Sequence, residues 1–592
     1  MKGLFLPKTK QKQKKKPFEI NFQKAISPRT LKYTSIGVIS LAGSYCIYKK
    51  YSNIQKQKQE QRLMNKMENS VPKEKIDSVN SLLKLIQQRS KLILTYKQIT
   101  KELFPILIQS LIASNLELGG CASKLLCKLI SDKNFSQHFL DLNGIENLIL
   151  AIQLNDPILP NTEANLTYLF TLLIQLIKHS KIQTVKKVVE SYGYPLICTL
   201  FLLPETPIET KVLILKIILK SSCYFLNVLE NVFHYEIFNE ILDSMKSTNG
   251  KFVKRCSNLI LKCSKSEKYI CNFTFKNIEY LIKILISVSW HEKDFKESKV
   301  KNKKIKSNLL NIYGNILNNL WKTLLFLSNF KKENSQIICQ NLEFRNLIFN
   351  NLLLNPKNKK NNQNTIQINS FQLLLSLSQM DQRNRIIIRK TPFFANLKRL
   401  INHKNDAICS LNINLISNLI NEQPLNRRII KSFPLLGIVD SLPKLLDRFK
   451  KNEQCIHHLI TIVNAFSKAD KKVRNKIINQ PIISKLIPIL KQTTNFQLQY
   501  KIIQTFSNYI YSIQVQKQLM KNGGIKLIIN RLELQNEKSL LLELNTVLNL
   551  LRNSKNNENQ VSKTIHHFKL FLLSSTFPNI YKTLTSNNRR LL

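Results

Sequence analysis

The chain of 592 residues is poor in the residues that form tight turns, with 12 glycines and 18 prolines. A protein built from many short strands needs such residues at each turn, so their scarcity excludes an all-β fold. Apolar residues instead recur at intervals of three and four, for example between Leu411 and Ile420. Because this spacing places them on one face of a helix, the sequence predicts an all-α protein.

Signatures of enzyme active sites are also missing. The sequence has no glycine-rich phosphate loop, no His-Glu-x-x-His motif and no Gly-x-Ser-x-Gly motif. Its 11 cysteines form no Cys-x-x-Cys pair, a pattern typical of reduced thiols. Cys455, His457 and His458 are close in sequence, but adjacent histidines point in different directions on a helix and a fourth ligand is lacking. We therefore expect a non-enzymatic protein with no cofactor and no metal site.

Acidic residues are scarce. There are 37 of them against 90 lysines and arginines, which gives a formal net charge of +53. Residues 1–62 hold 15 basic and 2 acidic residues, so most of the excess lies in the rest of the chain. Such a surface attracts acidic protein segments, anionic lipid head groups or RNA, with binding that weakens as salt rises. A solvated surface that reflects compositional bias is the alternative.

A short signature returns at a nearly fixed period. A turn residue leads into an apolar helix start, and a second, longer apolar helix follows. Gly437, Pro481 and Gly524 begin three such units and are 44 and 43 residues apart, and Gly144 and Gly193 begin similar ones. A fixed period of this size indicates stacked helical repeats, because a single helix pair cannot bury its apolar face alone.

We expect these repeats to form one domain over residues 79–592. Two polar stretches interrupt the period, at 292–307, which is rich in lysine, and at 355–364, which is rich in asparagine. Both are predicted to be solvated insertions.

The longer helices of the repeats carry a side-chain amide at matching positions. These residues are Asn329, Gln379, Asn418, Asn464, Asn508 and Asn549. With its Gly-Ile turn and the pattern Ile416-Ser417-Asn418-Leu419, the chain resembles the armadillo-repeat family, most clearly over residues 310–570. Over residues 80–300 a HEAT-like description fits equally well. The resemblance implies a right-handed α-solenoid of about ten repeats whose groove is lined by these amides.

An amide offers both a donor and an acceptor and can pair with the backbone of an extended peptide. We therefore expect the six amides to bind an extended, acidic segment of a partner protein. Solvated asparagines are the alternative, since asparagine is abundant in this chain. A nuclear transport adaptor is a more distant possibility. The family's import adaptors carry a tryptophan one turn before the asparagine, which this chain lacks, and a charge of +53 repels basic cargo.

The N-terminus is a separate module. Residues 1–32 hold ten basic residues and one acid, Glu19, and are predicted to be a disordered or targeting tail. Residues 33–48 contain no charge, and a polar spacer follows over 49–78. Sixteen helical residues span about 24 Å, a short membrane anchor that flanking lysines can extend by snorkelling. The apolar residues of this candidate transmembrane helix are Ile36, Val38, Ile39, Leu41 and Ile47.

This N-terminal arrangement is similar to signal anchors of the outer mitochondrial membrane and to animal armadillo proteins that pair an anchor with a cytosolic repeat domain. We expect a membrane-tethered interaction scaffold on the outer mitochondrial membrane, with its repeats facing the cytosol. A matrix-targeting presequence stays open, as do the inner membrane and another endomembrane. The alternative function is a basic helical-repeat subunit of a mitochondrial RNA-containing or respiratory assembly.

Overall fold

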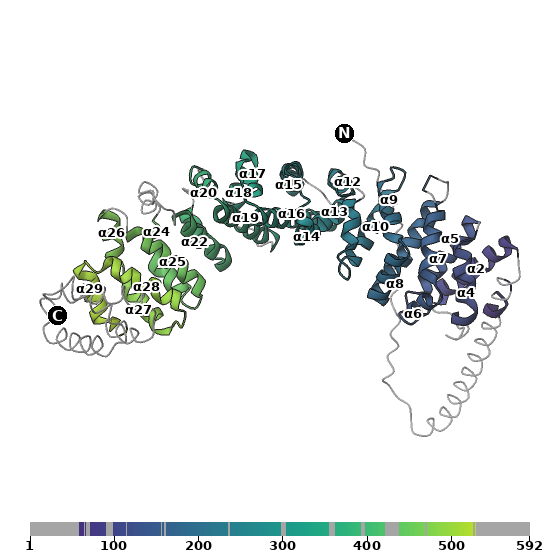
Figure 1. The fold of residues 1–592 in the computed structure, drawn as a ribbon, viewed down its shortest axis with the longest axis horizontal. Helices are drawn as coiled ribbons and strands as arrows, with labels where there is room; N and C mark the ends of the chain where they lie inside the picture. Colours follow the sequence, from purple (N-terminus) through teal and green to yellow (C-terminus); the bar gives the residue numbers. More distant parts are fainter. Residues whose placement is uncertain are drawn as a thin grey trace, which may run out of the picture. The chain divides into compact units, whose positions relative to one another are not determined.

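The computed structural model describes residues 59–63, 66, 71–89, 99–113, 115–155, 157–158, 162–234, 237–297, 303–353, 361–391, 397–420, 437–467, 471–524 and 527. All regular secondary structure in these residues is helical, as the sequence predicts (Figure 1). The chain divides into two compact units, Met1–Asn155 and Asp156–Leu592.

Among its described residues, the first unit contains the following α-helices and a π-helix. They are α2 (Pro72–Arg89), the π-helix η1 (Ile99–Leu103), α4 (Phe104–Leu111), α5 (Leu116–Leu129), α6 (Asn134–Asp141) and α7 (Gly144–Leu154). Helix α4 packs against both α5 and α7. The start of α7 requires glycine, because a Cβ at Gly144 would lie 2.5 Å from the ring and the carbonyl oxygen of Phe139.

The second unit begins with α8 and continues through α29. Its first helices are α8 (Thr162–Glu190), which is kinked at Ser180 and Lys181, α9 (Gly193–Leu202), α10 (Ile208–Ser221), α11 (Val228–His234), α12 (Ile237–Ser244), α13 (Gly250–Ser264), α14 (Glu267–Ile270), α15 (Phe275–Glu297) and α16 (Lys303–Phe330). They are followed by α17 (Lys332–Gln340), α18 (Leu342–Leu353), α19 (Asn361–Met380), α20 (Gln382–Arg389), α21 (Leu397–Ile401) and α22 (Asp406–Ile420). The last are α24 (Ile438–Arg448), α25 (Glu453–Ser467), α26 (Lys471–Ile478), α27 (Ile482–Gln492), α28 (Phe496–Tyr509) and α29 (Ile513–Lys521).

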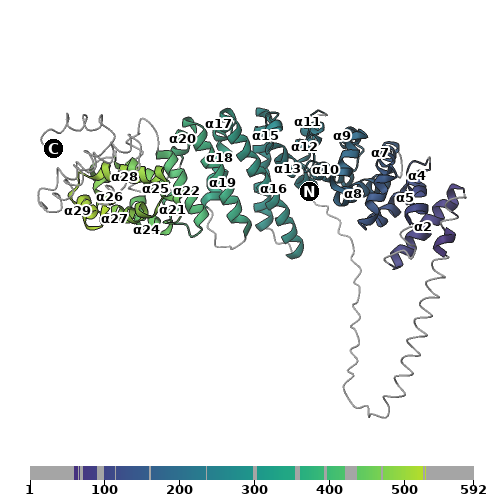
Figure 2. The ribbon, with the colours of Figure 1, turned by 60° about the horizontal axis from the view of Figure 1, so that its bottom comes forward.

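From α11 onward the described helices fall into groups with a short first helix, a second helix and a longer third helix, and α24 and α25 are the second and third helices of one group. One such group is α17, α18 and α19, and another is α26, α27 and α28. The third helices pack on one another in order along the unit, α10 on α13, then α16, α19, α22, α25 and α28 (Figure 2). We call these seven helices the third-helix row. The second helices form a parallel series, with α12 on α15, α15 on α18, and α24 between α21 and α27.

The core lies between the layers of successive repeats. Third helices contribute large aromatic side chains that are fully buried, namely Trp321, Phe371, Phe466 and Phe506. Aliphatic side chains on the same helices fill the space around them, as Leu415 and Ile416 do on α22. Each repeat therefore buries its apolar faces against its neighbours, which confirms the helical-repeat solenoid expected from the period.

Charged residues connect the outer parts of neighbouring repeats. Arg448 at the end of α24 donates from Nε to Asp406 Oδ1 at 2.8 Å, and its two terminal nitrogens donate to the carbonyl oxygens of His403 and Lys404 at 2.8 Å. Ion pairs also join Glu230 to Lys268, Asp440 to Lys476, and Asp447 to Lys485. Several of the few acidic groups are thus engaged between repeats.

Several predicted helix starts are confirmed, since α7 begins at Gly144, α9 at Gly193, α24 directly after Gly437 and α27 directly after Pro481. The described residues of the two predicted insertions are helical and belong to the neighbouring helices. Residues 292–297 continue α15 and 303–307 begin α16, while 361–364 form the first turn of α19.

The predicted tail and membrane anchor lie outside the described residues, as does Asn549. Of the predicted spacer, the part from Pro72 onward is helical and belongs to α2. Within the described part of the chain, no helix is both long enough and apolar enough to cross a bilayer.

Candidate partner-binding face

Five of the six predicted amides lie near the ends of consecutive third helices. Asn329 is on α16, Gln379 on α19, Asn418 on α22, Asn464 on α25 and Asn508 on α28. The first two are exposed and the other three are half-buried. We call these five residues the amide row.

The structure joins the last two members of the amide row directly. Asn508 Nδ2 donates to Asn464 Oδ1 at 3.4 Å, and Asn464 Nδ2 donates to the carbonyl oxygen of Lys501 and to Gln504 Oε1, both at 3.4 Å. Asn418 Nδ2 lies 3.5 Å from Ser378 Oγ on the preceding third helix. Bonds this long are weak, so these amides can exchange them for the backbone of a bound segment at low cost.

Further polar contacts between third helices were not foreseen from the sequence. Asn319 Nδ2 donates to Asn258 Oδ1 at 2.7 Å, which joins α16 to α13, and Asn369 Nδ2 donates to Asn318 Oδ1 at 2.6 Å, which joins α19 to α16. Asn329 Oδ1 accepts from Ser376 Oγ at 2.5 Å. These shorter bonds hold neighbouring third helices together, so Asn329 is partly engaged within the protein.

The start of the third-helix row is basic. Lys216 and Lys220 on α10 and Arg255 on α13 lie close enough to repel one another, and the pKa of Lys216 is lowered first by burial and then by these two neighbours. Lys254 and Lys262 lie on the same partly exposed side of α13. This end of the row attracts anionic groups.

Acidic residues are nearly absent from the rest of the row. Helices α13, α16, α19 and α28 contain neither aspartate nor glutamate, and α22 and α25 contain one each, at their first residue. Those two are engaged, since Asp406 binds Arg448, and Glu453 accepts from Thr493 Oγ1 at 2.9 Å. The row from α13 to α28 therefore presents amides, with cations on α13, α16 and α28, and little negative charge.

The histidines of α25 stand beside a lysine of α28. Burial, His457 and Lys501 together lower the pKa of His458 to about 4, and burial and Lys501 lower the pKa of His457. Cys455 instead contacts Ser410 Oγ at 2.7 Å, toward α22. No cluster of three or more His, Cys, Asp or Glu side chains able to hold a metal ion is found in the described ranges.

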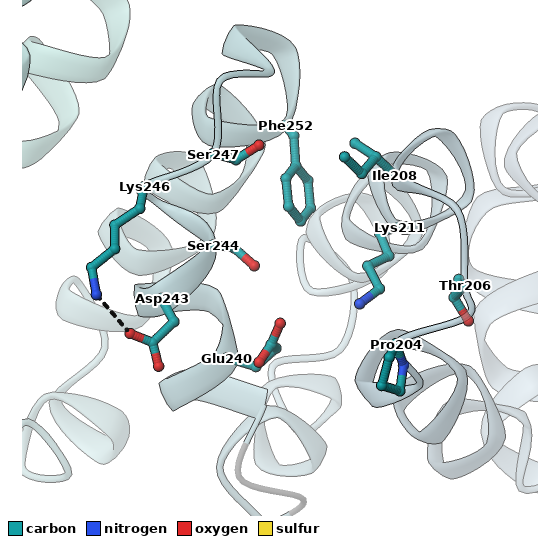
Figure 3. A pocket seen from close by; sticks show the side chains of 10 residues that line it. All are labelled: Pro204, Thr206, Ile208, Lys211, Glu240, Asp243, Ser244, Lys246, Ser247 and Phe252. Carbon is teal, nitrogen blue, oxygen red and sulfur yellow. Dashed lines mark ion pairs between the residues drawn. The ribbon is translucent and has the colours of Figure 1, made fainter.

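A surface hollow of about 420 Å³ lies away from the amide row, between the α9–α10 turn and α12. Figure 3 shows the ammonium group of Lys211 and the carboxylate of Glu240 pointing toward each other across it. Lys246 pairs with Asp243 at 3.5 Å on its outer side. Positive and negative groups thus balance in this hollow, in contrast to the third-helix row.

Comparison with known proteins identifies the fold alone. No family model matches the chain, and no curated protein matches it. The crystal structure of an engineered protein from a structural genomics consortium is similar, with a TM-score of 0.54, 11% identity, and coverage of 76% of this chain and 98% of that one. A structure from a study of a phosphorylation switch in the interaction between cadherin and β-catenin has a TM-score of 0.48 and 10% identity, and covers 83% of this chain and 99% of that one.

Proposed function

We propose that this protein is a non-enzymatic, armadillo-like interaction scaffold that binds an extended, acidic segment of a partner protein along its third-helix row. The observation that carries the proposal is the composition of this row. It presents side-chain amides on consecutive helices from α16 to α28 and cations on α10, α13, α16 and α28. From α13 to α28 its acidic residues are confined to the first positions of α22 and α25.

The two halves of the row suit the two parts of such a ligand. Amides can bind the backbone of an extended chain through both their oxygen and their nitrogen, whatever its sequence. The cations at the start of the row favour acidic side chains and accelerate encounter with them at low salt. The polarity of the surface thus supports recognition of a segment that is both extended and acidic.

The proposal is tested with a fluorescently labelled, glutamate-rich peptide and fluorescence anisotropy. We expect the triple variant Asn418→Ala, Asn464→Ala, Asn508→Ala to bind at least about tenfold more weakly than the parent, because it removes several contacts to the peptide. Its thermal stability should stay close to that of the parent because the bonds lost within the protein are long. Asn475→Ala, on the exposed side of the first helix α26, is the matched control. Equal binding by the triple variant and the parent would reject the assignment of the amide row.

We further propose that residues 33–48 tether the scaffold to the outer mitochondrial membrane, with the repeats in the cytosol. The absence of charge over these sixteen residues supports this. Alkaline carbonate extraction and protease protection of a chain tagged at Leu592 test it. Retention in the membrane pellet with digestion of the tag in intact organelles is expected. Release from a protease-protected compartment would instead favour import into the matrix.

A second function is supported by the basic side chains of α10 and α13. A helical-repeat subunit of a mitochondrial RNA-containing assembly would use Lys216, Lys220 and Arg255 to bind phosphates, with affinity that falls steeply as salt rises. Ultraviolet crosslinking in cells, followed by purification under denaturing conditions, distinguishes the two functions. Abundant RNA on the purified protein would favour the second.

A further inference from the structure

Lys501 is a cation within the amide-rich half of the third-helix row. It lies half-buried on α28, and its Nζ donates to Thr461 Oγ1 of α25 at 3.0 Å. The Thr461 hydroxyl donates its own hydrogen to the carbonyl oxygen of His457 at 2.9 Å. Its oxygen therefore accepts from the ammonium of Lys501 without contributing negative charge. An ammonium group has three donors, and none of the described carboxylates forms an ion pair with Lys501. The positive charge at this point is therefore uncompensated.

The ammonium of Lys501 acts electrostatically on two imidazoles of α25. The rings of His457 and His458 are 5.7 Å apart and nearly perpendicular. Helix α25 packs against α22, α24, α26 and α28. Among the described charged groups on these four helices, Lys501 is the one that lowers the pKa of both histidines. The other group that acts on His458 is His457. Burial and the nearby ammonium keep both rings neutral at pH 7.

Two members of the amide row lie next to the backbone of Lys501 and to each other. Asn464 Nδ2 donates to the carbonyl oxygen of Lys501, and Asn508 Nδ2 donates to Asn464 Oδ1. The acid on α25, Glu453, is at the opposite end of the helix, where it binds Thr493. An acidic side chain projecting from a segment on the amide row would thus meet Lys501 without a competing carboxylate.

We propose that Lys501, together with His457 and His458, binds one anionic side chain of the partner segment, a carboxylate or a phosphate, and that a proton is taken up by one of the imidazoles on binding. This inference rests on the proposed function of the third-helix row. It adds a defined position for one acidic residue of the ligand and a dependence of binding on pH.

The sign of the pH dependence follows from the charges. In the free protein, protonation of either imidazole is opposed by Lys501 and by burial. A bound anion offsets the ammonium charge and raises the pKa of the adjacent imidazole. Between the pKa of the free protein and that of the complex, binding takes up a proton, so affinity rises as pH falls. A shift of about one pKa unit gives up to about tenfold tighter binding, reached only below both pKa values. Because the pKa of His458 starts from about 4, a rise in affinity between pH 7.5 and 5.5 reports mainly on His457 and is smaller than tenfold.

The test measures the affinity of the full chain for the labelled glutamate-rich peptide between pH 7.5 and 5.5, where glutamate stays ionised. The variants are Lys501→Gln, Lys501→Met, which keeps an apolar stem of similar length, and His457→Gln combined with His458→Gln. Lys517→Gln removes the same charge from an exposed position on α29 and is the matched control. A phosphoserine version of the peptide compares the two anions.

We expect both Lys501 variants to bind about tenfold more weakly and Lys517→Gln to bind like the parent. Affinity of the parent should rise toward pH 5.5, and the double histidine variant should lose this rise. If Lys501→Gln binds like the parent while the triple amide variant is weakened, the anion site is wrong and the scaffold function stands. If neither variant changes binding, both proposals fail. Binding of a uridine oligonucleotide that depends on Lys501, without binding of the peptide, would assign the site to nucleic acid and overturn the proposal.

Discussion

Trp321 is the side chain whose removal should most affect the middle of the third-helix row. It is fully buried in α16 and stacks on Phe344 of α18, with ring centroids 5.3 Å apart. Trp321→Ala leaves a large cavity and should lower the free energy of unfolding by about 3–5 kcal/mol. Its indole nitrogen finds no acceptor among the described residues. Trp321→Phe keeps most of the packing and removes this unpaired donor, so it should cost about 1 kcal/mol or less.

The assay is urea unfolding followed by tryptophan fluorescence. The chain has two tryptophans, and the other one, Trp290, is 59% exposed. In a Trp290→Phe background, fluorescence therefore reports the surroundings of Trp321 alone. Both Trp321 variants remove this probe, so their midpoints and that of the parent are compared by circular dichroism, and the midpoint of Trp321→Ala should fall by about 1–2 M urea. Because each repeat stacks only on its neighbours, the repeats around α16 should unfold at a lower urea concentration than the rest of the chain in Trp321→Ala, which gives a second transition. An unchanged midpoint for Trp321→Ala, or an equal loss for Trp321→Phe, would refute the packing described for α16.

Three other perturbations test separate parts of the structure. Arg448→Gln loses the bond to Asp406 and should lower the free energy of unfolding by about 1–2 kcal/mol. The loss should be smaller at high salt, because the pair is partly exposed and salt screens it. Equal shifts of the urea midpoint at low and high salt would contradict this. Gly144→Ala forces a Cβ against Phe139 and should lower stability by about 1–3 kcal/mol, with a lower melting temperature for the first unit as the readout. Burial lowers the pKa of His458 to about 4, so the unfolded chain binds more protons below about pH 6.5 and stability should fall as pH drops from there toward 4. Because the ring is only half-buried and solvent screens its charge, the expected loss is about 1–2 kcal/mol. His458→Gln should flatten this fall in urea titrations across that range.

The sequence predicts the repeat architecture because the turn residues and the apolar spacing that indicate it are local and periodic. Gly437 adopts a left-handed conformation with φ of 66° directly before α24, and glycine is the residue that accepts this geometry without strain. The apolar period then identifies the helix that follows. For the same reason the amides of the longer helices can be placed on successive third helices, which is where Asn418, Asn464 and Asn508 lie.

Other features depend on contacts that no local pattern encodes. The short first helices escape recognition because they are too brief to show a period, as in α14, which covers 4 residues, Glu267–Ile270. The bond between Asn258 and Asn319 joins residues 61 positions apart, because the long α15 and α16 displace the register from the usual period. The uncompensated charge of Lys501 arises from its position beside α25, which the sequence of α28 does not reveal.

In the proposed function, a partner segment lies along the third-helix row. The most direct measurement places a photoreactive amino acid at position 508 on α28 and, in a separate protein, at position 475 on α26, and then crosslinks each to the glutamate-rich peptide. Both positions are within reach of solvent, but only the first is on the third-helix row. Binding along this row predicts strong crosslinking from position 508 that excess unlabelled peptide abolishes, and little from position 475. Equal crosslinking from the two positions, or stronger crosslinking from 475, would contradict it.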